Sequence, residues 1–175
     1  ARAQTYNDGV TLGAGTTLTT TDSLVWFKST VGNSAAKALS ISSGTGGVTF
    51  ANTVGTTTAL GAISITTSGT TTFSNTVGAA SLSSGLGTTA INTATITTTG
   101  AQTYNGAVTL GADATLTTTD SLVWFKSTVG NSAAKTLTIS SGTGGVRFDG
   151  SVGDTISLGA IDITTSGTTT IGGAI

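Results

Sequence analysis

Aromatic residues recur along this chain at nearly regular intervals, and a valine follows each of them four positions later. The sequence numbers of successive aromatic positions differ by 21, 23, 23, 31, 21, 23 and 23, the last step ending at an isoleucine. Between them, apolar residues alternate with polar ones, as in Leu39-Ser-Ile41 and Ile161-Asp-Ile163, which indicates short strands. The recurring pairs are Tyr6/Val10, Phe27/Val31, Phe50/Val54, Phe73/Val77, Tyr104/Val108, Phe125/Val129, Phe148/Val152 and Ile171/Ile175.

A repeat of about 22 residues, built of short strands with Gly between them, is typical of a β-solenoid. We therefore predict an all-β parallel solenoid of about eight coils of 21–23 residues. The one longer interval, from Phe73 to Tyr104, predicts an enlarged coil, with the extra loop within Ser81–Ala94. At about 4.8 Å per coil, the rod is on the order of 40 Å long. A β-sandwich also uses short strands and turns, but it does not require the same side chains at the same phase of every repeat.

A longer repeat contains the short one. Residues 3–77 align without a gap with residues 101–175, and 56 of these 75 positions are identical. We interpret residues 1–175 as one solenoid domain with an internal 98-residue duplication.

The aromatic register predicts which side chains face the interior. If the aromatic residues form one inward column, the residue before each of them points outward. Trp26 and Trp124 then lie on the surface, with Lys28 and Lys126 on the same face. Alternatively, a loop covers each tryptophan. The predicted outward column is Thr5, Trp26, Thr49, Thr72, Thr103, Trp124, Arg147 and Thr170.

Composition excludes several classes of function. Only 7% of the residues are charged, the net charge is −1, and Thr makes up about a quarter of the chain. Six scattered basic residues do not form the positive stripe that binds nucleic acid. No apolar run is long enough to span a membrane. The chain does not begin with Met and shows no signal peptide, so we interpret it as a processed product or a segment of a larger protein.

The chemistry of the side chains also limits catalysis. Without His, Cys or Glu, the chain has no Ser-His-Asp triad, thiol nucleophile or His-based zinc site, and we predict no enzyme, cofactor or metal. Paired Asp residues could still cleave a polysaccharide. The second copy has charged residues that the first copy lacks. They could form such a catalytic groove, or they could simply keep the surface of the rod soluble. These residues are Asp113, Arg147, Asp149, Asp154 and Asp162. The segment Gly142–Gly150 faintly resembles a calcium-binding nonapeptide.

Hydroxyl residues predict a ladder along the rod. Such a ladder stabilises a sheet by cross-strand packing, and a flat one could instead bind ice. The predicted column is Thr19, Ser42, Thr66, Thr97, Thr117, Ser140 and Thr164.

Two stretches resemble a known group of proteins. AQTYNGAVTLGADATLTTT (residues 101–119) and SGTTTFSNTVG (residues 68–78) are similar to repeats of large bacterial surface exoproteins of the filamentous-haemagglutinin and autotransporter-passenger type. The resemblance implies a right-handed parallel β-helix, secretion, and a role in adhesion or as an extracellular stalk. No recognisable secretion domain or membrane anchor accompanies the repeats.

Our hypothesis is an extracellular structural solenoid on the cell surface: an adhesin-like stalk segment or the subunit of a head-to-tail fibre. The expected partners are copies of the chain, end to end and side by side, and cell-surface glycans. Trp26, Lys28, Trp124 and Lys126 are the candidate lateral contacts. The candidate end-to-end contacts are Tyr6, Val10, Ile171 and Ile175. The alternative is a free binding module that recognises glycan or ice through its Trp or Thr face.

Overall fold

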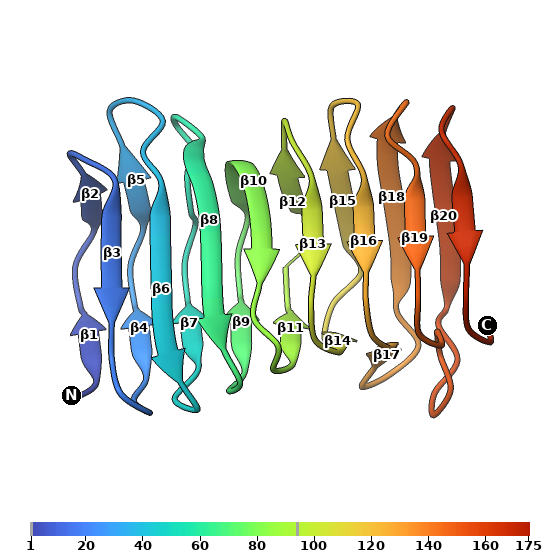
Figure 1. Ribbon diagram of the computed structural model, residues 1–175, viewed down its shortest axis with the longest axis horizontal. Helices are drawn as coiled ribbons and strands as arrows, with labels where there is room; N and C mark the ends of the chain where they lie inside the picture. Colours follow the sequence, from blue (N-terminus) through green and yellow to red (C-terminus); the bar gives the residue numbers. More distant parts are fainter. Residues whose placement is uncertain (1, 94) are drawn as a thin grey trace.

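The chain forms a rod of stacked coils. The computed structural model describes residues 2–93 and 95–175, and these contain only strands, turns and loops. They wind into a parallel β-solenoid of about eight turns, which confirms the predicted fold class (Figure 1). The coils run up the back of the rod and down its front as they advance from the N-terminus, so the winding is right-handed (Figure 1). Strand pairing among the described residues is parallel throughout, so the sandwich alternative is wrong.

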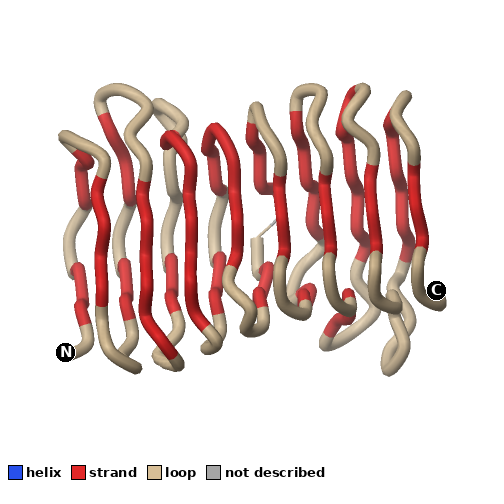
Figure 2. The backbone as a smooth tube through the Cα atoms, in the orientation of Figure 1, coloured by secondary structure: helices blue, strands red, loops and turns tan. Residues whose placement is uncertain are grey.

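Each full coil crosses three faces of the rod, here named A, B and C, mostly with one short strand on each face. Figure 2 shows the strands of each face lying side by side along the rod, with loops at the corners. Face A is one sheet of β1 (Gln4–Tyr6), β4 (Val25–Phe27), β7 (Val48–Phe50), β9 (Thr71–Phe73), β11 (Thr89–Ile91), β14 (Val108–Leu110) and β17 (Val129–Asn131).

Faces B and C are joined by one long strand, β10 (Val77–Ser84), whose first half lies on B and second half on C. Face B also contains β2 (Val10–Leu12), β5 (Val31–Asn33), β12 (Thr95–Thr98), β15 (Ala114–Thr118), β18 (Thr136–Gly142) and β20 (Ala160–Thr165). Face C contains β3 (Thr16–Thr19), β6 (Leu39–Gly44), β8 (Leu60–Thr67), β13 (Gln102–Tyr104), β16 (Val123–Phe125), β19 (Val146–Phe148) and β21 (Thr169–Ile171).

The core is a set of columns that run the length of the rod. On face B, β-branched and aliphatic side chains stack in register, and burial of this apolar surface drives the coils together. Aromatic rings stack in two separate piles, with ring centroids 4.8–5.4 Å apart and planes within 9° of parallel. The face B column is Val10, Val31, Val54, Val77, Ile96, Leu116, Ile139 and Ile163.

The predicted enlarged coil is wrong. On face A, Thr71 pairs with Thr89, and Thr89 pairs with Val108. Both steps span fewer residues than the step from Val48 to Thr71 on the same face, so the coils between the two copies are shorter than the others. The expected loop in Ser81–Ala94 is replaced by the end of β10, a turn and β11, with Ala94 itself outside the described residues.

The short coils turn the second copy relative to the first. Four turns along face A lead from Gln4 to Thr89. The equivalent of Gln4 in the second copy is Gln102. Thr89 begins a coil on face A, and Gln102 lies in the same coil, two faces farther along, on face C. The offset between the copies is thus four and two-thirds turns. Every strand of the second copy consequently lies one face away from its counterpart in the first.

This rotation corrects the expected single aromatic column. The rings of the first copy stack on face A and are continued by Ile91 and Leu110. The rings of the second copy stack on face C, where Tyr104 follows Ser84. The predicted inward direction of the rings is confirmed, because Phe27, Phe50, Phe73, Tyr104, Phe125 and Phe148 are all buried.

A buried polar network lies where the second copy begins. Tyr104 and Gln102 are fully buried, and the Tyr104 hydroxyl donates to Gln102 Oε1 at 2.9 Å. The Gln102 amide donates to the backbone carbonyls of Thr117 (2.9 Å) and Ile96 (3.2 Å). Burial raises the pKa of Tyr104 far above its usual value, so the phenol stays a donor. The network satisfies polar groups that would otherwise be unpaired in the core.

The duplication supplies a matched test of this network. We expect Gln102→Ala to lower the free energy of unfolding by about 1–3 kcal/mol, because it leaves the buried Tyr104 hydroxyl without its acceptor. The control is Gln4→Ala, since Gln4 makes the same bond to Tyr6 at the half-exposed end of the rod. Urea denaturation measures both, and equal losses would show that burial of the network is not what matters.

Candidate interaction surfaces

The two tryptophans lie on different faces. Trp26 is the middle residue of β4 on face A, and Trp124 is the middle residue of β16 on face C. Each has buried neighbours on both sides in its strand and is itself half-buried, with its side chain on the outer side. The predicted single outward column is therefore wrong, because the rotation of the second copy divides it in two. Thr72 is followed by Ala90 on face A, and Thr103 by Trp124 on face C.

Trp124 is enclosed by charged side chains. Its indole N–H donates to Asp149 Oδ2 at 2.8 Å, and Asp149 Oδ1 accepts from Arg147 Nε at 2.5 Å. The Lys126 ammonium lies 4.4 Å from the ring centroid and the Arg147 guanidinium 5.1 Å from it. Lys126 also donates to Asn105 Oδ1 at 2.9 Å. The indole N–H of Trp124 and one N–H of the Lys126 ammonium, both predicted contact residues, are thus bonded within the chain.

Trp26 has a simpler environment. Lys28 lies 4.6 Å from its ring centroid, but Thr49 and Ala51 take the places of Arg147 and Asp149 in the next coil. Its indole nitrogen is buried and has no hydrogen-bond partner among the described residues. The same decapeptide, Ser23–Gly32 and Ser121–Gly130, therefore gives two chemically different surfaces.

Two aspartates have carboxyl pKa values below the usual range, for local reasons. The pKa of Asp149 is lowered first by the hydrogen bond from Arg147 and then by that from Trp124. The pKa of Asp22 is lowered chiefly by the Thr45 backbone N–H, which donates to its Oδ1 at 2.9 Å from the next coil. Both carboxylates act as links between adjacent coils.

The charges gained by the second copy do not form one groove. Asp113 accepts from the Thr136 backbone N–H at 2.9 Å, and Asp154 accepts from the Ser151 hydroxyl. Asp162 lies on face B, exposed. Only Arg147 and Asp149 form an ion pair among the described residues.

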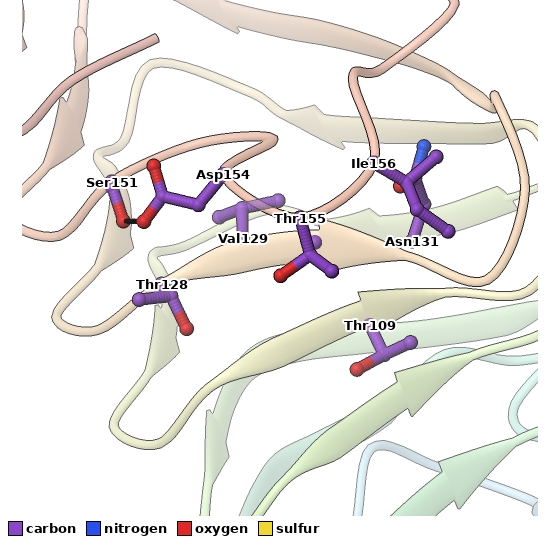
Figure 3. Close-up of a pocket in the computed structure, with 9 residues that line it drawn as sticks. Thr109, Thr128, Val129, Asn131, Ser151, Asp154, Thr155 and Ile156 are labelled. Carbon is purple, nitrogen blue, oxygen red and sulfur yellow. Dashed lines mark hydrogen bonds between the residues drawn. The ribbon is translucent and has the colours of Figure 1, made fainter.

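Matching grooves lie beside the Val-Gly-Asn strands. The one in the second copy has a volume of about 320 Å³ on face A, lined by Thr109, Thr128, Asn131 and Asp154 (Figure 3). Its counterpart in the first copy, of about 350 Å³, lies on face B. Both exist because Gly130 and Gly32 have open space where a side chain would stand. Both grooves are lined largely by hydroxyl and amide groups, and no pattern in the sequence predicts them.

The hydroxyl ladder is also divided between faces. Thr19, Ser42 and Thr66 stack on face C of the first copy. Thr97, Thr117, Ser140 and Thr164 stack on face B. Each ladder is regular, but neither continues along the whole rod.

The ends of the rod carry the other predicted contacts. Tyr6 and Val10 are half-buried in the first coil, on faces A and B. Ile171, on face C, is 49% exposed, and Ile175 is 68% exposed. These are among the most exposed large apolar side chains of the described residues, with Leu86 and Ile156.

The described residues contain neither a metal-binding cluster nor a membrane-spanning helix. No cluster of three or more His, Cys, Asp or Glu side chains is arranged to hold a metal ion. No helix in this part of the chain is long and apolar enough to cross a membrane.

The indole of Trp124 should report the ionisation of Asp149. Because the folded-state pKa of Asp149 lies below the ordinary value of about 3.9, its contribution to stability is present above that value and is lost as the pH falls through the lowered pKa. We expect the indole N–H signal of a Trp26→Phe variant to shift in NMR spectra with a midpoint below about pH 3.9, and Asp149→Ala to abolish the shift. A midpoint at or above the ordinary value would contradict the bonding described for Arg147, Trp124 and Asp149.

Comparison with protein families, with curated proteins and with solved structures gave no match to this chain.

Proposed function

We propose that the chain is a structural solenoid, forming part of an extracellular stalk or fibre on a cell surface. The observation that carries the proposal is the state of the two ends of the stack. Strands β20 and β21 have no neighbour on their outer side among the described residues, and β1 and β3 have none at the opposite end. Unpaired edges of this kind pair readily with another strand.

The apolar columns at the two ends match on faces B and C. On face B, Val10 lies at one end and Ile163 at the other, and on face C the corresponding residues are Leu18 and Ile171. Stacking one rod on another without rotation would place these aliphatic side chains in contact and continue the backbone ladders. Such a head-to-tail contact does not close on itself and produces filaments.

The sides of the rod fit a structural role. They are covered mainly by hydroxyl residues and carry few charges. Several of the charged side chains, such as Asp22, Asp113 and Asp120, accept hydrogen bonds from the backbone of the next coil. The resemblance of the repeats to surface exoproteins supports an extracellular location and an adhesin-like stalk. The expected lateral contacts point in different directions, because Trp26 lies on face A and Trp124 on face C.

The end contacts can be tested with charged substitutions. We expect the 175-residue chain to form fibres at high concentration, visible by electron microscopy and as large species in sedimentation. Ile171→Asp combined with Ile175→Asp should leave single rods, because a carboxylate buried in an apolar contact is strongly unfavourable.

Leu86→Asp is the matched control. Leu86 is 78% exposed but lies in the turn between β10 and β11, midway along the rod. This variant should form fibres as the parent does. A parent chain that stays monomeric at high concentration would overturn the end-to-end proposal.

A further inference from the structure

The duplication provides an internal comparison for the Trp26 surface. Residues 17–37 are identical to residues 115–135, so the two tryptophans and their lysines have the same local sequence. Differences enter from the next coil, where Thr49 and Ala51 replace Arg147 and Asp149. The second copy therefore shows which chemical groups bind to the tryptophan and lysine of this decapeptide when the next coil supplies them.

In the second copy, these groups are a carboxylate that accepts from the indole N–H and a planar guanidinium next to the indole ring. The carboxylate of Asp149 takes the indole N–H, and the Arg147 guanidinium lies against the ring. Lys126 adds a positive charge close to both. Charge-assisted hydrogen bonds of this kind are the strong ones in proteins.

In the first copy, the same donors remain without these partners. The Trp26 nitrogen is a buried donor with no acceptor among the described residues, and buried donors without an acceptor are uncommon. Of the described cations, only Lys28 lies over the ring. Compared with the Trp124 surface, the Trp26 surface therefore lacks a carboxylate beside the indole N–H and a planar group on the indole ring.

We infer that Trp26 and Lys28 bind a uronate residue of an acidic polysaccharide. The sugar carboxylate takes the position that Asp149 has in the second copy, between the indole N–H and the lysine ammonium. The pyranose ring packs on the part of the indole that Arg147 contacts in the second copy, because an indole offers an apolar face and a polar edge. The nitrogen is covered in the free chain, so binding includes a turn of the indole towards the carboxylate. The inference holds for a fibre and for a free rod, and does not depend on the proposed function.

The two indole N–H signals of the ¹⁵N-labelled chain make a direct test, with Trp26→Phe used to assign them. The probe is an oligogalacturonate, and a neutral galactose oligosaccharide of the same length is the control. We expect a saturable shift of the Trp26 signal alone, with roughly tenfold weaker binding of the neutral sugar because it lacks the charged acceptor. No shift, or equal shifts of both signals, would overturn the site. A shift with polyglutamate but not with the uronate would overturn the assignment to a polysaccharide.

Reciprocal variants sharpen the result. Thr49→Arg with Ala51→Asp supplies the first copy with its own carboxylate and should abolish uronate binding at Trp26. Arg147→Thr with Asp149→Ala should create binding at Trp124. Retention of the Trp26 response in the first variant would overturn the inference. If a variant fails to fold, the titration of the parent chain decides.

Discussion

The parallel backbone ladder between consecutive coils holds every other feature of this rod in place. No coil has a core of its own, because a single layer of strand on each face cannot enclose one. Once the ladder fixes the register, each inward side chain meets the equivalent side chain of the next coil. The result is columns of like residues, such as the valines of face B and the stacked rings of Phe27, Phe50 and Phe73.

The ladder also explains how the large polar side chain of Gln102 is accommodated inside the rod. Stacking brings Gln102 within hydrogen-bond distance of backbone carbonyls in two coils and of the Tyr104 hydroxyl in its own strand. On the outside of the rod, the exposed Asp22 and Asp120 accept backbone N–H groups from Thr45 and Thr143, one coil farther along. Polar side chains thus reinforce the same contact between coils that the apolar columns make.

The rotation of the second copy decides how the two tryptophans are presented. A repeat of a whole number of turns would place both tryptophans on one side of the rod. Because the offset between the copies is four and two-thirds turns, they present their surfaces in different directions. The charged cluster at Trp124 and the indole of Trp26, whose N–H has no partner among the described residues, are then separate surfaces, and the Thr49/Arg147 and Ala51/Asp149 differences make them chemically different.

Repeat length and side-chain alternation were enough to specify the solenoid, its parallel coils and the inward direction of the aromatic rings, because both follow directly from strand geometry. The sequence also contained the paired changes at Thr49 and Ala51, which a comparison of the copies could have connected to Trp124. The phase between the copies came from the three-dimensional structure alone. The segment from Phe73 to Tyr104 could hold one enlarged coil or a coil and two-thirds of the next, and only the pairing of Thr71, Thr89 and Val108 distinguishes the two. Backbone pairing across coils is non-local, so no local pattern of residues specifies it.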